Sequence, residues 1–215
     1  MIDSFPQQHC RLGIALLLCL LLPGCEEPPR YRPLLEGATV LAFGDSVTHG
    51  TGAKAGEDYP SQLAGFTGWH VINAGIPGDL ARDAGARLPA LLQEHSPALV
   101  IVELGGNDFL RKRPAAQVKS ELNAMLDMVV AADAIPVLVA VPRLSLLRAS
   151  TGTLKDAPLY AELAEERNIV LVEDVFADTL SDEALRSDPI HPNALGYRQL
   201  ADSIATRLRS AGLLE

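Results

Sequence analysis

The sequence predicts an α/β protein in which a parallel sheet of five strands is covered by helices on both faces. Short runs rich in valine, isoleucine and leucine alternate along the chain with longer segments of helical spacing. These short runs lack polar alternation, which is typical of strands buried on both sides. Regular alternation of strand and helix favours parallel strands with right-handed crossovers, and hence a three-layer α/β/α domain.

The predicted elements follow one another without a long break. The strand candidates are the apolar runs at residues 38–43, 71–73, 99–104, 136–141 and 169–172. The helix candidates, in which apolar residues recur at helical spacing, are residues 60–66, 80–95, 114–132, 158–167 and 193–210. Proline at the start of segments such as 114–132 suits the first turn of a helix, where its missing N–H is not needed. We therefore expect five strands in one three-layer domain.

Length and charge limit the class of protein. The 215 residues suffice for one domain with a sizeable core, and they contain no repeat or low-complexity tract. The net charge of -9 is spread along the chain, whereas a nucleic-acid-binding protein would carry a basic stripe. The sequence thus favours an acidic monomer that acts on a small molecule and binds no nucleic acid.

The first residues do not belong to this domain. Arg11 is followed by the apolar run 12–22, which has the length of a signal peptide and is too short for a permanent membrane-spanning helix. The run ends in Leu-Pro-Gly-Cys at 22–25, which resembles the bacterial lipobox, where the cysteine is acylated and becomes the new N-terminus. We expect a signal peptide at residues 1–24 and lipidation of Cys25. A plain signal peptide cleaved nearby is the alternative.

The residues after this cysteine are expected to connect the lipid to the folded chain. Residues 25–36 contain several prolines and are predicted to form a tether, with the domain at 37–215. The protein would then be exported to a bacterial periplasm and contact a membrane through its lipid anchor. Cys10 and Cys19 leave with the signal peptide, so no disulfide is expected within the mature chain.

A serine follows the first predicted strand directly. The sequence Gly-Asp-Ser at 44–46 places a hydroxyl beyond the carboxyl end of that strand, where ligands bind in open parallel sheets. Ser46 is therefore a candidate nucleophile, which would need a base within hydrogen-bond reach and donors for the oxyanion. Taken alone, these three residues also fit an ordinary turn after a strand.

An acid and a histidine lie close together near the C-terminus. Asp188 precedes His191 by three residues in a loop just before the last predicted helix. Prolines at 189 and 192 stiffen this loop. The imidazole can accept the serine proton while the carboxylate holds its tautomer. By itself, such a pair more often marks a capped helix start with a solvated histidine.

Two glycine-rich turns are predicted at the same edge of the sheet. Residues 73–79, Asn-Ala-Gly-Ile-Pro-Gly-Asp, follow the second strand, and residues 103–108, Glu-Leu-Gly-Gly-Asn-Asp, follow the third. Glycine lets the backbone approach a substrate closely, and an exposed N–H or the Asn107 amide is a donor of the type that an oxyanion hole needs. The residues alone do not distinguish Gly75 from Gly78 as the donor.

These four segments, in this order, resemble the SGNH hydrolases, also called the GDSL esterase/lipase family. The similarity covers the whole exported domain and is greatest for the bacterial periplasmic thioesterase, lysophospholipase and arylesterase group. Two further segments match that group, Ala-Arg-Leu-Pro-Ala-Leu-Leu at 86–92 and Val-Glu-Leu-Gly-Gly-Asn-Asp at 102–108. The resemblance implies a flavodoxin-like fold and hydrolysis of esters by a serine enzyme.

The resemblance also implies roles for individual residues. Ser46 would be the nucleophile, and Asp188 and His191 would complete a catalytic triad. The Ser46 N–H, the Gly78 N–H and the Asn107 side chain would form the oxyanion hole. The match of residues 78–79 to the second block of the family selects Gly78 over the other glycine.

One loop departs from the family pattern. Members of the similar group carry a Tyr-Gly pair after the fourth strand, whereas residues 143–154 are rich in leucine here. The loop opens at the edge that carries Ser46, so Leu144 and Leu147 are predicted to bind the acyl chain. The alternative is that these leucines only cover the core.

The remaining polar candidates have structural interpretations. No second ligand stands at metal spacing near three histidines, which are expected on the surface or in packing: His49, His70 and His95. We expect no metal and no cofactor. Three acids are assigned to structural hydrogen bonds: Asp45, Glu103 and Asp108. Tyr59 and Trp69 are expected in the core or at its edge.

The sequence therefore predicts a serine esterase that works through an acyl-enzyme. Its expected substrates are aryl or short-to-medium acyl esters and lysophospholipids, with thioesters as further candidates. One alternative is an O-acetyl esterase acting on cell-wall or secreted carbohydrate. Another is a lipid-anchored binding module without turnover.

Overall fold

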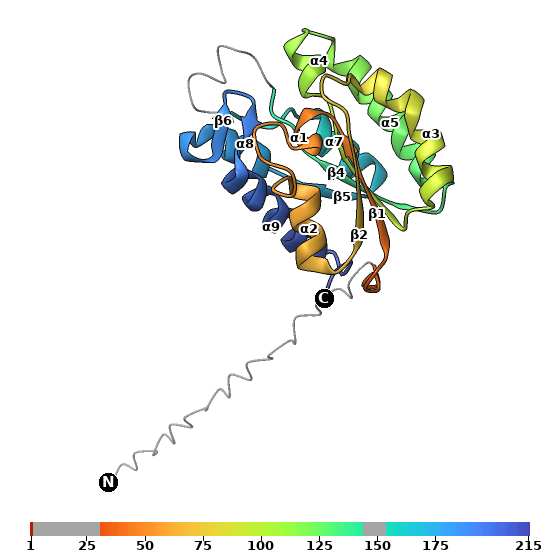
Figure 1. The fold of residues 1–215 in the computed structure, drawn as a ribbon. Coiled ribbons are helices and arrows are strands. Elements are labelled where there is room, and N and C mark those ends of the chain that lie inside the picture. Colours follow the sequence, from red (N-terminus) through yellow and green to blue (C-terminus); the bar gives the residue numbers. More distant parts are fainter. Residues whose placement is uncertain (2–30, 144–153) are drawn as a thin grey trace.

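A parallel sheet forms the middle layer of the computed structural model, which describes residue 1, residues 31–143 and residues 154–215 (Figure 1). The strand order is β2-β1-β3-β4-β5, and every neighbouring pair is parallel. The strands are β1 (Thr39–Gly44), β2 (His70–Gly75), β3 (Leu99–Glu103), β4 (Ile135–Val139) and β5 (Val170–Val172). The predicted fold class is confirmed, and the strand boundaries differ from the prediction by one or two residues, most at β2 and β4.

Five long helices cover the two faces of this sheet. They are α2 (Tyr59–Thr67), α3 (Ala81–His95), α5 (Ala115–Ala131), α7 (Leu159–Arg167) and α9 (Ala194–Ser210). The helices α3, α5 and α7 lie on one face, and α2 and α9 pack against each other on the opposite face (Figure 1). Each helix was predicted from its spacing, with boundaries within about one residue of those observed.

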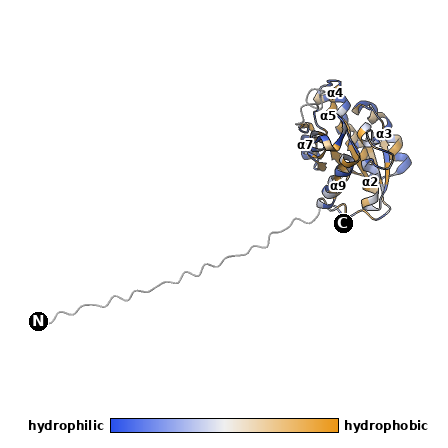
Figure 2. Ribbon diagram, turned by 60° about the vertical axis from the view of Figure 1, so that its left-hand side comes forward, coloured by the Kyte–Doolittle hydropathy of each residue, from blue (hydrophilic) through white to orange (hydrophobic). Residues whose placement is uncertain are grey.

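The core lies between the sheet and these helices. Residues 40–43 of β1 are fully buried, as are residues 99–102 of β3, because helices cover both sides of the central strands. Tyr59 and Trp69 are buried as well, in agreement with their predicted structural role. Figure 2 shows the hydrophobic strands enclosed by helices that carry hydrophilic residues.

Short elements that the sequence did not reveal follow the sheet strands. They are α1 (Ser46–His49), α4 (Gly106–Leu110), α8 (Val175–Ser181), the 3₁₀ helix η1 (Glu183–Leu185), and the small hairpin of β6 (Arg186–Asp188) and β7 (His191–Pro192). Most of them span only one or two turns or a few residues, so they show no hydrophobic period from which a helix or strand could be predicted. They lie beyond the carboxyl ends of β1, β3 and β5 and carry most of the functional candidates.

The chain enters the fold at the opposite end of the sheet. The Leu34 N–H donates to the Leu213 carbonyl at 3.0 Å, and Tyr31 and Leu34 pack against the core. Two residues of the predicted tether, Tyr31 and Leu34, thus contact the domain, and the predicted boundary at 37 stays a prediction. The rest of the predicted signal peptide and tether, with Cys25, lies outside the described residues.

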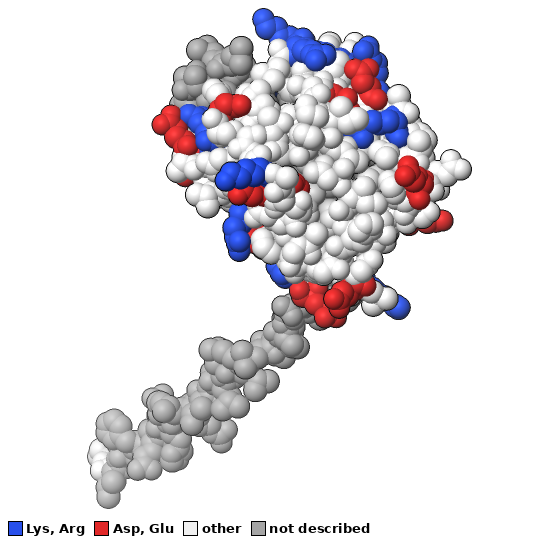
Figure 3. All heavy atoms as spheres, viewed as in Figure 1, with Lys and Arg blue, Asp and Glu red and all other residues white. Residues whose placement is uncertain are grey.

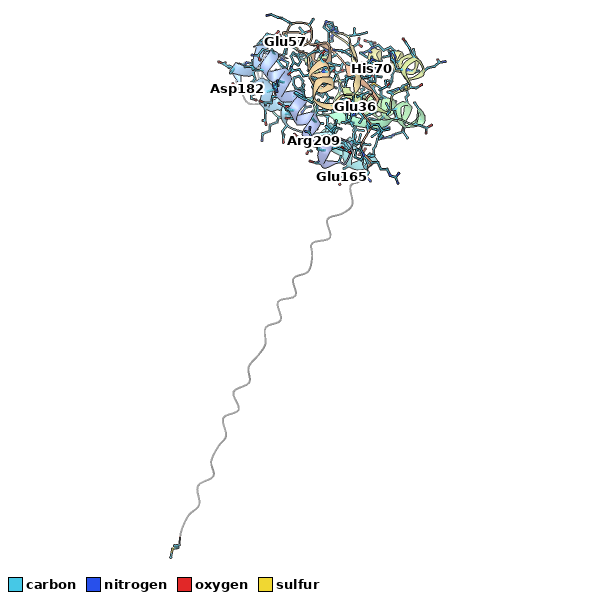
Figure 4. All side chains as sticks on the ribbon, turned by 60° about the horizontal axis from the view of Figure 1, so that its bottom comes forward. Glu36, Glu57, His70, Glu165, Asp182 and Arg209 are labelled. Carbon is cyan, nitrogen blue, oxygen red and sulfur yellow. The ribbon has the colours of Figure 1, made fainter. Side chains whose placement is uncertain are left out.

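The surface carries both signs of charge. Lysine and arginine are interspersed with aspartate and glutamate on the face shown in Figure 3. Figure 4 shows the molecule from the end at which the strands begin, with His70 and Glu36 labelled. Among the described residues, no helix is long and apolar enough to cross a membrane.

Candidate active site

Ser46 begins the helix α1, which follows the strand β1. Asp45 caps this helix, because its Oδ1 accepts the Val47 N–H at 3.1 Å. The turn is therefore defined by a buried carboxylate, while the Ser46 side chain itself stays partly exposed. This arrangement places the hydroxyl at the carboxyl edge of the sheet, where the sequence predicted it.

The β6–β7 hairpin holds Asp188 and His191 in one orientation. Asp188 Oδ1 accepts two backbone N–H groups, from Ile190 at 2.8 Å and from His191 at 2.9 Å. Its other oxygen, Oδ2, lies 2.8 Å from Nδ1 of the His191 ring. The Asp188 carboxylate thus holds the loop by bonds to backbone N–H groups as well as by its bond to the imidazole. The two prolines in the sequence did not indicate these backbone bonds.

The hairpin brings the imidazole to the serine. His191 Nε2 lies 3.0 Å from Ser46 Oγ, although 145 positions separate the two residues along the chain. Only 14% of the His191 side chain is exposed, so it is not the solvated histidine of the alternative interpretation. Burial alone would raise the pKa of Asp188, but hydrogen bonds from the His191 ring and from the Ile190 N–H outweigh it and lower that pKa below its usual value. The acid is therefore an anion at neutral pH.

The turn after β2 presents a backbone N–H. Gly78 has a φ of +86°, which favours glycine, and it is exposed near the end of this turn. The Gly75 N–H donates to the Asn73 side chain at 3.0 Å, whereas no described residue accepts from the N–H of Gly78 or of Ser46. The structure therefore leaves Gly78 free to bind a ligand and commits Gly75 to the turn.

Arg87 connects this turn to the strand β1. Its Nε donates to Asp79 Oδ2 at 2.9 Å, and its NH2 group donates to the Gly44 carbonyl at the same distance. The guanidinium also lies over the Phe43 ring, 4.3 Å from its centroid. In the sequence, this arginine is only one residue of the segment 86–92 that matches the family. Its structural role could not be predicted, because it depends on how α3 packs against the sheet.

The turn after β3 presents the Asn107 amide. Gly105 has a φ of +123°, and a Cβ at this position would lie 2.2 Å from the Tyr160 hydroxyl, so glycine is required here. The Tyr160 hydroxyl itself donates to the Leu104 carbonyl at 2.7 Å and thereby holds the turn. Asn107 Nδ2 donates to Asp45 Oδ2 at 2.9 Å and to the Asp79 carbonyl at 3.1 Å. The amide thus connects the three turns that follow β1, β2 and β3.

A small cavity opens beside the serine hydroxyl. It has a volume of about 10 Å³, roughly the space of one water molecule, and its apolar lining consists of Val47, Leu110, Phe176 and Ile190. The sequence did not single out any of these four residues, because they come from separate short elements. The predicted acyl contacts Leu144 and Leu147 lie outside the described residues, and their role stays a prediction.

Two carboxylates lie buried beneath the serine. Burial raises the pKa of Asp45 to about 6, against the hydrogen bond from Val47, the charge of His191 and the bond from Asn107. Burial, and then the charge of Asp45, hold the pKa of Glu103 well above its usual value. Glu103 Oε2 accepts from the Thr48 hydroxyl at 3.0 Å, while Oε1 has no partner among the described residues.

The other structural candidates lie as follows. Asp108 Oδ2 accepts the Ala81 N–H at 3.0 Å, and its Oδ1 pairs with Arg113, so the expected structural role of this acid is confirmed. His49 and His70 are exposed, and His95 is partly buried. In the described ranges, no three histidine, cysteine or acidic side chains are grouped so that they could hold a metal ion.

Comparisons with known proteins support an assignment to an enzyme family. Residues 42–199 match the model of the GDSL-like lipase/acylhydrolase family. The chain is 35% identical to thioesterase 1/protease 1/lysophospholipase L1 of Escherichia coli over 80% of this chain and 83% of that protein. It is 30% identical to an arylesterase of Vibrio mimicus over 79% of this chain and 87% of the relative. The crystal structure of TesA superposes with a TM-score of 0.71 at 28% identity, covering 80% of this chain and 99% of that one.

Proposed function

The chain belongs to the GDSL-like lipase/acylhydrolase family and is a serine ester hydrolase, and on this basis we propose that Ser46, His191 and Asp188 form its catalytic triad. The observation that carries the proposal is the continuous hydrogen-bonded path from Ser46 Oγ through the imidazole to the Asp188 carboxylate. A binding module without turnover would have no need of this path.

Acylation follows from the geometry of the path. The His191 Nε2 atom accepts the proton as Ser46 Oγ attacks the ester carbonyl, and a tetrahedral oxyanion forms. The anionic Asp188 stabilises the positive imidazolium through its bond to Nδ1. The imidazolium then gives its proton to the departing alcohol, and the acyl group stays on the serine.

Deacylation repeats these steps with water as the nucleophile. Water loses a proton to the imidazole and attacks the acyl-enzyme, and the serine then leaves with that proton. In both steps the oxyanion is held by the N–H groups of Ser46 and Gly78 and by the Asn107 amide. The two backbone donors have no acceptor among the described residues, which supports this role.

The substrates are carboxylic esters with an aryl group or a short-to-medium acyl chain, with lysophospholipids and acyl thioesters as further substrates. The names of the relatives cover thioesterase, lysophospholipase and arylesterase activities. The hollow beside Ser46, with a volume of about 10 Å³, is far smaller than typical ligand sites, which begin at roughly 300 Å³, and apolar side chains line it. This apolar lining suits a hydrocarbon group next to the reacting carbonyl.

A direct test compares substrate classes on one preparation of the mature protein. The panel consists of p-nitrophenyl esters from acetyl to dodecanoyl, a lysophospholipid, an acyl-CoA and an acetylated sugar. We expect the highest kcat/KM on short-to-medium p-nitrophenyl esters. Turnover confined to the acetylated sugar would instead favour the carbohydrate O-acetyl esterase.

A substitution in the cavity tests which residues meet the acyl chain. Leu110 lies at the end of α4, lines the cavity and is only partly buried. In Leu110→Trp, the larger indole takes space from the chain, and each methylene that it displaces is worth about 0.8 kcal/mol, or roughly fourfold. We therefore expect kcat/KM on the octanoyl ester to fall by at least about tenfold relative to the acetyl ester.

The matched control for this variant is Leu195→Trp. Leu195 is exposed on α9 and does not line this cavity, so the same change there should leave the ratio of the two rates unaltered. Equal losses on both esters in Leu110→Trp would show that the chain binds elsewhere.

The proposal includes export and lipidation at Cys25. Leu34 packs beside Leu213, at the end of the sheet opposite Ser46, so a lipid on Cys25 would hold the domain with its active site facing away from the membrane. We expect metabolic labelling with a clickable fatty acid to mark the wild-type protein, and Cys25→Ser to abolish the label. Cys19→Ser should keep it, because that residue leaves with the signal peptide.

The outcome separates the two interpretations of the N-terminus. If the segment is a plain signal peptide, the mature protein should be soluble and should carry no fatty-acid label in the wild type or in either cysteine variant. Label that persists in Cys25→Ser would place the acyl group on another residue.

A further inference from the structure

We infer that Asp45 is a positioning residue for catalysis, which orients the Asn107 amide so that one of its N–H groups can donate to the oxyanion. This inference rests on the proposed function. It gives a role in turnover to an acid that otherwise only caps a helix. The observation behind it is the hydrogen bond of 2.9 Å from Asn107 Nδ2 to Asp45 Oδ2.

The chemistry of the two side chains makes this bond directional. An amide has one oxygen that accepts and one nitrogen that donates, so a turn of 180° about its last bond exchanges the two. An ionised carboxylate can only accept. Asp45 therefore selects the rotamer of Asn107 in which the nitrogen faces the serine side of the site. The opposite rotamer would bring an oxygen toward both the carboxylate and the developing oxyanion.

Asp45 is itself held firmly. Its side chain is only 3% exposed, and its Oδ1 accepts the Val47 N–H at 3.1 Å. The carboxylate thus joins the helix that begins at Ser46 to the amide on α4. A second acceptor, the Asp79 carbonyl, lies 3.1 Å from the same nitrogen, and an oxyanion in the site would take over the hydrogen that this carbonyl accepts. Of these two acceptors, only the carboxylate can be changed without altering the backbone.

The charges that face Asp45 come from several elements. Glu103 on β3 and Asp108 on α4 oppose its ionisation, whereas His191 on β7 favours it. Arg87 on α3 binds the carbonyl of the preceding strand residue. Burial is the largest effect, and it raises the pKa of Asp45 from 3.8 to about 6 against the Val47 hydrogen bond and the charge of His191, so the carboxyl becomes protonated as the pH falls through about 6. Protonation adds an O–H donor and removes the selection of one rotamer.

The same shift predicts how stability responds to a neutral replacement. Between pH 4 and 6 the folded chain binds more protons at Asp45 than the unfolded chain does, so this residue contributes less stability as the pH rises through that range. At neutral pH the buried charge is a net cost. An uncharged residue at this position should therefore not lower the melting temperature through loss of the charge.

The test is a double-mutant cycle on the mature protein with a p-nitrophenyl ester. In Asp45→Asn, the oxygen of the new amide keeps the hydrogen bond from the Val47 N–H, and its NH2 group faces Asn107. The Asn107 amide then turns by 180°, so that its oxygen takes the place of the nitrogen that donated. We expect kcat to fall by about 10² to 10³, as for the loss of one oxyanion donor, with KM nearly unchanged. Asn107→Ala should show a similar loss, and the double variant should be no worse than Asn107→Ala alone.

Two further variants separate positioning from folding. Asp58→Asn is the matched control, because Asp58 is also a buried helix cap, accepting the Ser61 N–H, and also lies beside an asparagine amide, that of Asn73. It should keep the wild-type kcat. Asp45→Ser retains a good cap for the helix but is too short to reach Asn107. It should keep the melting temperature and lose kcat as Asp45→Asn does.

The pH profile gives an independent readout. The acid limb of kcat should be steeper in the wild type than in Asp45→Asn, because protonation of Asp45 near pH 6 contributes to it only in the wild type. The inference would be overturned if the loss of kcat in the double variant equalled the product of the losses in Asp45→Asn and Asn107→Ala. A wild-type kcat in both Asp45 variants would overturn it as well. A wild-type protein without turnover, or a Ser46→Ala variant with it, would instead refute the proposed function.

Discussion

Ser46→Ala is expected to lower kcat for ester hydrolysis by at least about 10⁴, because the acyl-enzyme cannot form without the hydroxyl. The only described hydrogen bond of this hydroxyl is the one to His191 Nε2. The variant should therefore fold normally, with a change in the free energy of unfolding of about 0.5 kcal/mol or less. Initial rates on a p-nitrophenyl ester and a thermal melt measure both quantities.

A fluorophosphonate probe identifies the reactive serine directly. The wild type should be labelled at one residue, and Ser46→Ala should take up no label. Ser210→Ala is the control, because Ser210 is exposed near the end of α9 and should not affect the labelling. Hydrolysis at a normal rate by folded Ser46→Ala would refute Ser46 as the nucleophile.

Asp188→Asn is expected to reduce kcat by about 10⁴, through the tautomer of the imidazole. The oxygen of the new amide must stay where Oδ1 now accepts the N–H groups of Ile190 and His191, so its NH2 group faces Nδ1 of the ring. A donor at that position requires Nδ1 to be an acceptor, which moves the ring proton to Nε2. Nε2 can then no longer accept the Ser46 proton.

The loop itself should persist in this variant, because both backbone bonds are kept. Asp182→Asn provides the control, since Asp182 also accepts a backbone N–H, from Ala184 at 2.8 Å, but lies outside the triad. It should leave kcat unchanged. A loss of only a few-fold in Asp188→Asn would mean that another group, or water, holds the ring, and the acid would then be removed from the triad.

The prediction from sequence was strongest where an element is long. Helices such as α5 and α9 were located to within about one residue, because several turns repeat the same apolar face. The short helices α1, α4 and α8 were missed, since they contain too few residues for a period. The candidate site was nevertheless predicted, because its residues occupy turns that follow strands, and parallel strands end at one edge.

The site also shows where sequence reasoning stops. From the residues alone, Gly75 and Gly78 were equivalent, and the structure separates them because the Gly75 N–H already has an acceptor in the Asn73 side chain. Asp45 was assigned only a structural role. Its bond to Asn107 joins residues 62 positions apart, and no local pattern indicates which carboxylate oxygen meets which amide.

The sequence by itself determined the parallel α/β fold, the order of its strands and helices along the chain, and the residue types needed for serine chemistry. These features depend on local propensity, hydrophobic period and the common edge of parallel strands, all of which can be read from neighbouring residues. Only the tertiary structure decided the distances of 3.0 Å from Ser46 to His191 and 2.8 Å from His191 to Asp188, the free N–H of Gly78 and the apolar lining beside Ser46. Those depend on how distant segments pack, because hydrogen bonds and burial act through space and not along the chain.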